Sequence, residues 1–367
     1  MYTYNGENIQ IDIYGGSHEP VIGVKLRGVR AGVKLERTAL GEFMARRAPG
    51  RDKYSTPRVE ADAVEFLSGV CDDITDGGEI HAIIRSTNQR SSDYSKFEDT
   101  PRPSHADYTA RVKYGDSVNM AGGGPFSGRM TAPLCIAGGI ALGILRGMGI
   151  TVGAHIARIG DERDIPFDPV CVTAEQLDEI KKKPFPAADD TCGDRMAERI
   201  LEAKAEGDSV GAVIECAAVG VGVGFGGPLF EGLESRIASL AFAVPAVKGV
   251  EFGSGFGCAS MKGSEHNDPY IIRDGKIMTL TNNSGGIAGG ISNGMPIIFR
   301  AALKPTPSIA KEQETVSLSR METATLTIGG RHDPCVGVRA VPVIEAVCAL
   351  GLLDAINSEQ YPKEGLI

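Results

Sequence analysis

Two segments that lie far apart in the chain each place an arginine, a histidine and an aspartate within a few residues. Segment 102–108 reads Arg-Pro-Ser-His-Ala-Asp-Tyr, and segment 330–335 reads Gly-Arg-His-Asp-Pro-Cys. A third histidine, His18, follows Gly-Gly-Ser in similar loop-forming sequence. Histidine exchanges protons near neutral pH, and arginine binds carboxylates and phosphates. These segments therefore indicate acid–base chemistry on an anionic substrate, and we interpret the other three histidines as structural.

Two glycine-rich segments could bring backbone N–H groups close to a phosphate or a flat ring. Residues 122–124 are three consecutive glycines just before an apolar stretch, although a plain tight turn would use the same sequence. Residues 282–294 contain five glycines and five small polar residues, and Lys304 follows with Thr306 and Ser308. A cation and two hydroxyls can hold a phosphate, so this region predicts a cradle for a phosphorylated cofactor. The alternative interpretation is a long mobile loop.

Two further patterns are weaker evidence for ligand sites. Residues 222–227 match the GxGxxG dinucleotide fingerprint and follow an apolar, strand-like run. Pro228 interrupts the expected helix, and the sequence shows no second mononucleotide-binding half, so a nicotinamide site remains the minor alternative. The cluster of Arg46, Arg47 and Arg51 is either a solvated helix end, where the macrodipole favours cations, or an anion clamp.

Composition places the chain among ordinary globular proteins. Of its 367 residues, 42% are hydrophobic and 23% are charged, so the chain can bury a large core. A net charge of −9 argues against a general nucleic-acid binder. Eight scattered cysteines form no CxxC pair and no zinc spacing, so we expect reduced thiols, no metal site and a cytoplasmic protein. The N-terminus carries no secretion signal, and the apolar stretch 130–145 predicts a buried helix rather than a membrane span.

Hydrophobic periodicity predicts the framework that must position these residues. Alternating or apolar runs predict strands over 8–13, 21–29, 79–85, 151–159, 209–219, 276–281 and 295–302. Helical spacing predicts helices over 38–47, 129–146, 191–206, 228–243 and 336–353. Residues 160–190 are polar and proline-rich, and we expect them to form an exposed excursion. Hairpin-like strand pairs favour antiparallel sheets, so the prediction is a single α+β domain over residues 1–367.

The ordered motifs resemble those of a known family, the chorismate synthases, from about residue 8 to residue 354. The motifs that carry this resemblance are 15–18, 46–50, 67–69, 88–94, 102–108, 113–115, 207–209, 246–251, 285–292, 304–306, 330–335 and 339–342. The resemblance implies a β-α-β sandwich, in which helices pack between antiparallel sheets, and a homotetramer. This architecture agrees with the α+β, antiparallel prediction made from periodicity.

The resemblance also implies a reaction. Chorismate synthases convert 5-enolpyruvylshikimate 3-phosphate to chorismate and phosphate by an anti-1,4-elimination that needs reduced FMN without net redox change. His18 would then be the acid near the departing phosphate, and His105 would sit beside the flavin and maintain its protonation state. Asp333 would assist removal of the C6 hydrogen through the flavin N5. We expect no nucleic-acid or membrane partner.

The resemblance assigns two sets of binding residues. The substrate's phosphate and carboxylates would be bound by Arg46, Arg47, Arg129 and Arg331. FMN would contact Ser127, Ala246, Gly289, Lys304, Thr306, Ser308 and Arg331.

The chain departs from the family pattern at several motif positions. Gly16 stands where most members carry an acidic residue, and Glu19 stands where most carry glycine. Ser104 replaces a glycine, and Lys53 replaces an arginine and loses its bidentate fork. Residues 125–126, Pro-Phe, replace an Arg-Ser pair in the flavin-binding stretch, which removes one cation and one hydroxyl. We therefore interpret the chain as a divergent member of the family. The alternatives to a working enzyme of this kind are a non-catalytic relative that binds an anionic metabolite and a flavin- or nicotinamide-dependent oxidoreductase.

Overall fold

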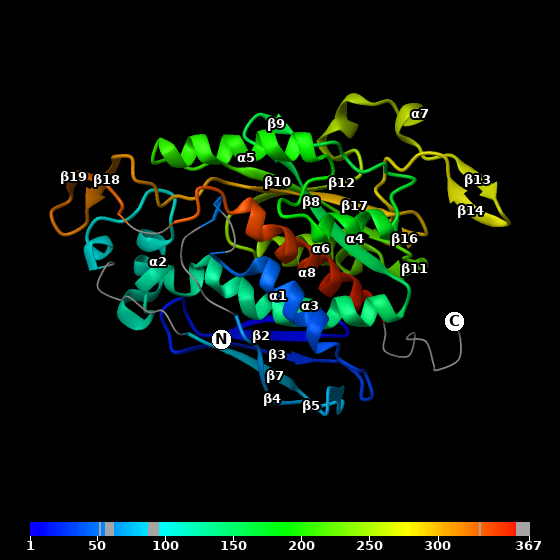
Figure 1. Ribbon diagram of the computed structural model, residues 1–367, viewed down its shortest axis with the longest axis horizontal. Helices are drawn as coiled ribbons and strands as arrows, with labels where there is room; N and C mark the ends of the chain where they lie inside the picture. Colours follow the sequence, from blue (N-terminus) through cyan, green and yellow to red (C-terminus); the bar gives the residue numbers. More distant parts are fainter. Residues whose placement is uncertain (51–52, 56–61, 87–94, 330–331, 357–367) are drawn as a thin grey trace.

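The computed structural model describes residues 1–50, 53–55, 62–86, 95–329 and 332–356. Two five-stranded sheets enclose a layer of helices (Figure 1). The first sheet has the order β1-β2-β3-β7-β4, with bounds Tyr2–Asn5, Gln10–Tyr14, Val21–Arg27, Ile80–Arg85 and Glu65–Ser68. The second has the order β12-β17-β10-β8-β9, with bounds Val247–Phe252, Ile297–Leu303, Ala212–Val219, Thr151–Ile159 and Glu162–Arg163.

Every described strand pair is antiparallel, as the hairpin-like sequence pattern predicted. For example, β2 pairs with β3 so that Ile11 faces Leu26, and β10 pairs with β17 so that Cys216 faces Phe299. The smaller sheets are β11-β16-β15 (Val223–Gly226, Ile291–Asn293, Ile287–Ala288), β13-β14 (Tyr270–Arg273, Lys276–Thr279), β18-β19 (Gln313–Ser317, Glu322–Leu326) and β5-β6 (Val70–Cys71, Ile74–Thr75).

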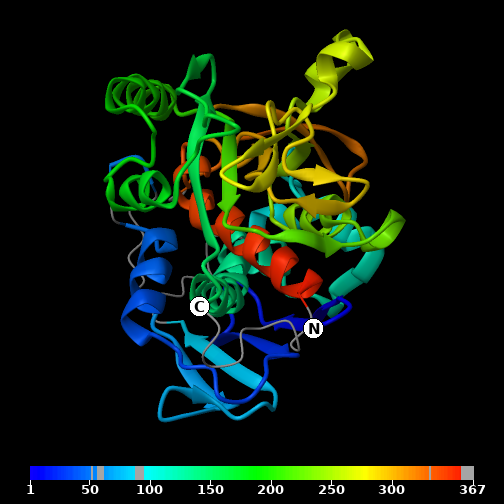
Figure 2. The same ribbon diagram turned by 90° about the vertical axis from the view of Figure 1, so that its right-hand side faces the viewer.

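The helices between the sheets are α1 (Arg37–Arg47), α3 (Thr131–Gly147), α6 (Leu233–Phe242) and α8 (Gly337–Ala355). Helix α3 packs on β3 and β7 of the first sheet and on α8, and α8 packs on β8 and β10 of the second. Two other helices, α4 (Ala174–Lys182) and α5 (Asp190–Ala205), cover the outer face of the second sheet (Figures 1 and 2). The predicted α+β sandwich with helices between antiparallel sheets is confirmed.

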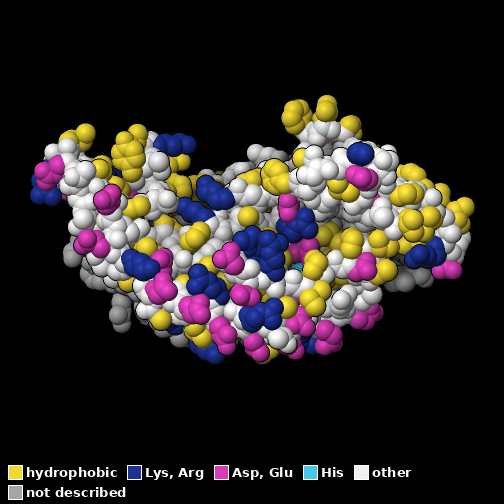
Figure 3. All heavy atoms as spheres, turned by 90° about the horizontal axis from the view of Figure 1, so that it is seen from above, with side chains coloured by type: hydrophobic (Ala, Val, Ile, Leu, Met, Phe, Trp, Pro, Cys, Tyr) yellow, Lys and Arg dark blue, Asp and Glu magenta, His cyan; other side chains and the backbone are white. Residues whose placement is uncertain are grey.

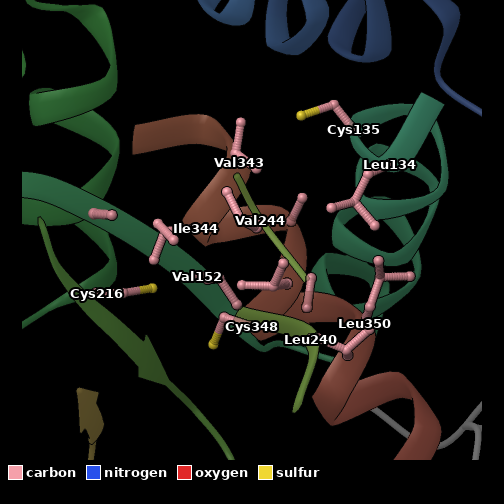
Figure 4. Packing of buried hydrophobic residues seen from close by; sticks show 14 of the residues in the cluster. Leu134, Cys135, Val152, Cys216, Leu240, Val244, Val343, Ile344, Cys348 and Leu350 are labelled. Carbon is pink, nitrogen blue, oxygen red and sulfur yellow. The ribbon is translucent and has the colours of Figure 1, made fainter. Parts of the chain in front are cut away.

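Helices α3 and α8 form the centre of the core because they are apolar around most of their circumference, as a helix must be when it is covered on all sides. Figure 4 shows side chains from α3, α6, α8, β8 and β10 packed together, including Leu134, Leu240, Ile344 and Leu350. Among the described residues, one helical stretch, 128–147, is long and apolar enough to cross a membrane. However, 78% of its most apolar window is buried inside the protein, so the prediction of a buried helix is confirmed.

Two predictions about the framework are wrong. Residues 160–190 are not simply an exposed excursion, because they contain α4 and bury Phe167, Leu177 and Ile180 against the outer face of the second sheet. Their proline content and short apolar spacing hid this small amphipathic helix. The predicted helix 228–243 begins only at Leu233, because residues 229–231 form a separate 3-10 turn. The predicted strands at 276–281 and 295–302 are confirmed as β14 and β17, in different sheets.

The sequence analysis also missed α2 (Asp107–Tyr114), whose eight residues carry little apolar periodicity. A short α7 (Gly263–His266) leads into the hairpin β13-β14, which projects from the body of the protein (Figures 1 and 2). Hydrophobic side chains gather on this hairpin, at the right-hand end of Figure 3. Ile272 and Ile277 face each other across its two strands and are 81% and 70% exposed.

Candidate active site

A cavity of about 650 Å³ lies where the ends of several elements meet, at the start of α8 and the end of α6. Among the described residues that line it, the cations are Arg47, Arg102, Arg129, Lys248, Lys304 and Arg339. The carboxylate among these lining residues is Asp333. Two further carboxylates, Asp62 and Asp107, lie behind the wall and pair with Arg47, Arg129 and Arg102. Six cations still outnumber these three carboxylates, and a cavity with an excess of positive charge concentrates anionic ligands.

Three consecutive glycines lie against two of the predicted catalytic histidines. His105 and Gly122 line the cavity, and His18 lies directly behind Gly122 without being one of the lining residues. Residues 122–124 all have positive φ, with values of 63°, 87° and 51°. A Cβ on Gly122 would lie 2.4 Å from Cδ2 of His18, and a Cβ on Gly123 would lie 3.3 Å from Nε2 of His105. The glycines are therefore required both for the turn and for the close approach of the two imidazoles. The interpretation of this run as a plain turn is incomplete.

His105 is oriented by a carboxylate that an arginine holds in turn. Nδ1 of His105 lies 2.7 Å from Oδ1 of Asp107, while Nε and Nη2 of Arg102 donate to Asp107 at 2.7 and 2.8 Å. Burial alone would raise the pKa of Asp107, but the hydrogen bonds from Arg102 and His105 lower it well below its usual value. With Nδ1 bound to Asp107, Nε2 is the nitrogen of His105 that is left to exchange a proton in the cavity.

A second buried carboxylate positions two of the predicted substrate arginines. Asp62, whose side chain is fully buried, accepts from Arg47 through Oδ2 and from Arg129 through Oδ1. Burial opposes ionisation of Asp62, but the two arginines lower the pKa of its carboxyl. Arg47 also donates to Thr131 Oγ1 at 3.1 Å. Both guanidinium groups are thus fixed before a ligand arrives, and rotational freedom is not lost on binding.

The third predicted catalytic residue, Asp333, also lines the cavity. Its Oδ2 accepts from Nη1 of Arg339 at 2.6 Å, and Nε of Arg339 donates to the backbone oxygen of Arg47 at 3.1 Å. This chain of contacts connects the loop before α8 to the end of α1. The predicted ligand Arg331 lies outside the described residues.

The part of the wall around Lys304 carries groups that suit a phosphate. Lys304 donates to the backbone oxygen of Ser104, and its backbone N–H donates to Ala246 at 2.9 Å. Burial lowers the pKa of Lys304, and the neighbouring Lys248 lowers it further. Thr306 Oγ1 is buried and has no hydrogen-bond partner among the described residues. Two adjacent ammonium groups and an unsatisfied hydroxyl are the partners that an added phosphate would satisfy.

Of the remaining predicted cofactor residues, two line the cavity and one does not. Ser127 and Ser308 line it, and each already has a partner: Ser127 Oγ accepts from the Arg129 N–H at 3.3 Å, and Ser308 Oγ accepts from Arg102 at 3.2 Å. Gly289 is not among the lining residues, because it lies in the turn between β15 and β16. The glycine-rich segment 282–294 forms these short strands and packs backbone against backbone, so it does not contribute to the described cavity.

Arg46 was predicted to bind substrate, but the structure places it elsewhere. Its Nη1 and Nη2 donate to the two carboxylate oxygens of Glu345 at 2.6 and 2.8 Å. Glu345 is completely buried in α8 and also accepts from the backbone N–H of Ala154 in β8 at 3.1 Å. Arg46 therefore joins α1, α8 and the second sheet, and the neighbouring Arg47 is the one that reaches the cavity.

Comparison with known proteins agrees with this arrangement. The chain matches the chorismate synthase family over residues 9–356. It is 43% identical over 375 residues to the chorismate synthase of Lancefieldella parvula, which covers 99% of this chain and 98% of that protein. It is 44% identical over 355 residues to that of Korarchaeum cryptofilum, covering 96% of both chains. This chain belongs to the chorismate synthase family.

A solved chorismate synthase structure shares the fold. Its TM-score is 0.73 at 24% sequence identity, and the match covers 96% of this chain and 92% of the other. The dinucleotide fingerprint, by contrast, has no structural counterpart. Residues 222–227 enter β11, an antiparallel strand of a small sheet, and the described sheets contain no parallel βαβ unit. The alternative of a nicotinamide site there is not favoured.

Two departures from the chorismate synthase pattern have a visible structural setting. A Cβ on Gly16 would lie 3.3 Å from Oε1 of Glu19, so the Glu19 carboxylate occupies the space that a side chain at position 16 would enter. The exchange of the two residue types therefore leaves an acidic group in the same region beside His18. Ser104, which replaces a glycine, has a φ of 57°, a conformation that costs a residue with a side chain about 1–2 kcal/mol.

Several residues at the site were not assigned from sequence. Arg102 and Asp107 lie inside a motif that the sequence analysis singled out, and Arg339 lies in another, so a closer interpretation of these motifs could have found them. Lys248 lies in motif 246–251 and could have been found in the same way, whereas Asp62 lies in none of the motifs. An isolated aspartate in a sequence looks like a surface residue until the fold shows what it contacts.

Proposed function

We propose that this protein is a chorismate synthase, a lyase that removes phosphate from 5-enolpyruvylshikimate 3-phosphate by anti-1,4-elimination to give chorismate. The observation that carries the proposal is His105 on the wall of a cavity with six cations, with His18 behind the lining residue Gly122 and against the glycine that precedes the one His105 contacts. An elimination that releases phosphate needs an acid near the leaving group and fixed positive charge around it. Both requirements are met in one place.

The arginines would stabilise the charge that develops on the departing phosphate. Arg47 and Arg129 are held by Asp62, so they do not need to reorganise as negative charge accumulates. His18, directly behind Gly122, would give the departing phosphate a proton. The substrate carboxylates would be bound by the remaining guanidinium groups of the wall.

Removal of the C6 hydrogen would occur on the side of the cavity that carries His105 and Asp333. Asp107 holds His105 in one orientation, and Arg339 holds Asp333 in its place. His105 would stand beside the cofactor and maintain its protonation state, while Asp333 would assist the proton's departure. The proposed proton donor, His18, and the residue that would assist proton removal, Asp333, are thus supplied by segments far apart in sequence.

The cavity also fits the flavin that the family requires, and we propose that the flavin is FMN. Lys304, Lys248 and the Thr306 hydroxyl, which has no partner in the described part of the chain, would bind its phosphate next to Ala246. Apolar side chains among the lining residues would suit a flat ring, and they include Phe126, Phe242, Val244, Pro245 and Val343. Reduced FMN, when bound, supplies electron density that favours cleavage of the carbon–oxygen bond and is not consumed.

We further propose that the protein acts as a homo-oligomer, a tetramer by family resemblance, in the cytoplasm. The projecting hairpin β13-β14 supports association with a second copy, because exposed apolar side chains on such an arm need a covering surface. Sedimentation of the wild-type protein and of Ile272→Asp/Ile277→Asp tests this, and a tetramer in both would contradict the role of the hairpin. The eight free thiols suit a reducing compartment.

The deciding experiment is anaerobic. The protein is mixed with photoreduced FMN and 5-enolpyruvylshikimate 3-phosphate, and chorismate absorbance is followed together with free phosphate. Equal release of both products, with flavin still reduced at the end, would establish the elimination. Binding of both ligands without product would refute the proposed activity.

Two variants test the assigned roles. His105→Ala should lower turnover by about 10²–10⁴-fold, the range for general acid–base groups, with little change in the far-ultraviolet circular dichroism spectrum. Lys304→Ala should weaken FMN binding more than substrate binding. An unchanged affinity for FMN by titration would remove Lys304 from the phosphate site.

A further inference from the structure

His332 is a third histidine at the cavity, and the mechanism above gives it no task. It lies in the loop that precedes α8 and lines the cavity beside Asp333. Arg102, His105 and Asp333 are the charged and titratable groups that act on its ring electrostatically. It therefore lies where motif 102–108 meets the described residues of motif 330–335.

The two ring nitrogens of His332 differ in their surroundings. Nε2 is buried and has no hydrogen-bond partner among the described residues. The hydrogen bond that the ring does make is with the backbone of Gly329. A backbone oxygen requires a donor, so Nδ1 carries the proton of the neutral ring and Nε2 is left as an acceptor.

The surroundings also favour the neutral ring. Burial lowers the pKa of His332, and the neighbouring Arg102 lowers it further, while Asp333 and the Gly329 contact only partly oppose them. A neutral imidazole next to a fixed guanidinium is a hydrogen-bond acceptor in an otherwise donor-rich cavity. Leaving a buried acceptor unsatisfied is costly, so its partner is expected to arrive with a ligand.

We infer that His332 is a ligand-contacting residue of the active site, whose Nε2 accepts a hydrogen bond from an N–H or O–H group of a bound ligand. This inference rests on the proposed function, which supplies two ligands with suitable donors. Reduced flavin carries ring N–H groups that oxidised flavin lacks, and the substrate carries a hydroxyl. The lysines and arginines of the wall donate hydrogen bonds to acceptor atoms of a ligand. His332 would instead accept a hydrogen bond from a donor group of the ligand.

The test uses two variants of the full chain. His332→Leu has a similar volume and removes the acceptor, whereas His332→Gln restores a side-chain oxygen near the position of Nε2. His266→Gln, which changes a histidine of α7 that does not line the cavity, is the matched control. Far-ultraviolet circular dichroism of all proteins confirms that they remain folded.

Two binding titrations distinguish the source of the donor. In the first, dissociation constants are measured anaerobically for photoreduced FMN and separately for oxidised FMN. In the second, the dissociation constant of 5-enolpyruvylshikimate 3-phosphate is measured with oxidised FMN present, so that no turnover occurs. We expect His332→Leu to raise the dissociation constant of one of these ligands by about 10-fold or more. His332→Gln should recover most of the lost affinity.

Each outcome has a defined meaning. Weaker binding of reduced but not oxidised FMN identifies a flavin N–H as the donor, and weaker binding of the substrate identifies its hydroxyl. Wild-type affinities in both variants would overturn the inference and leave the proposed function standing, as would a loss in His332→Leu that His332→Gln does not recover. A wild-type protein that binds neither ligand would refute the proposed function and this inference with it.

Discussion

Replacing Arg46 with alanine should destabilise the protein while leaving its affinity for substrate unchanged. The Arg46 guanidinium donates to both oxygens of Glu345, and the Glu345 side chain is completely buried. After the substitution, the described partner that remains to this carboxylate is the backbone N–H of Ala154. Removing one member of a buried ion pair costs about 3–5 kcal/mol, because the other charge is left uncompensated. That is a large part of the roughly 5–15 kcal/mol by which proteins are stable.

The assay is urea unfolding followed by far-ultraviolet circular dichroism, at one protein concentration because association also stabilises the folded state. The double variant Arg46→Met/Glu345→Leu removes both charges and should recover most of the lost stability, since apolar replacements of buried ion pairs are often neutral or better. The same proteins are titrated with 5-enolpyruvylshikimate 3-phosphate. A wild-type urea midpoint for Arg46→Ala, together with much weaker substrate binding, would refute this reasoning and restore Arg46 to the substrate site.

Three further substitutions test other parts of the structure. His155 lies between Asp164 and Glu215, at 2.7 and 3.1 Å, and although burial lowers its pKa the two carboxylates raise it. Its contribution to stability is therefore complete below the unfolded-state pKa of about 6.5 and is lost as pH rises through the folded-state pKa. The difference in unfolding midpoint between wild type and His155→Gln should thus shrink as pH rises. Gly122→Ala should lower turnover at least about 10²-fold, measured as phosphate release, because the new Cβ displaces His18. Ser104→Gly should raise the free energy of unfolding by about 0.5–1 kcal/mol. The substitution removes the cost of a positive φ, but part of this gain is offset because glycine has greater entropy in the unfolded state.

Matched controls separate these effects from general damage. His266→Gln should show no such pH-dependent difference. Gly147→Ala, at the end of α3 where an added Cβ meets nothing within 4 Å, should keep wild-type turnover. Ser254→Gly, at a φ of −66°, should lower stability. A pH-independent deficit in His155→Gln, normal turnover in Gly122→Ala or a less stable Ser104→Gly would each contradict the corresponding argument.

The sequence by itself determined the framework and most of the chemical groups. A helix that is apolar around most of its circumference must be covered by other elements on all sides. The burial of stretches such as 131–147 and 337–355 therefore follows from their composition. Strand alternation and hairpin spacing were enough for antiparallel sheets. The three glycines at 122–124 and the two Arg-His-Asp segments pointed to the candidate site, and the described residues of all three segments include members that line the cavity.

Only the tertiary structure decided which members of these groups act together. Arg46 and Arg47 are neighbours in sequence, but on a helix successive side chains point about 100° apart, so one meets Glu345 and the other meets Asp62. Nothing local distinguishes them, because each partner comes from a distant segment. For the same reason, Gly289 was expected at the site but does not line the cavity, whereas Lys248 lines it without having been assigned. Long-range packing brings chain segments together, and periodicity within a short window carries no information about that packing.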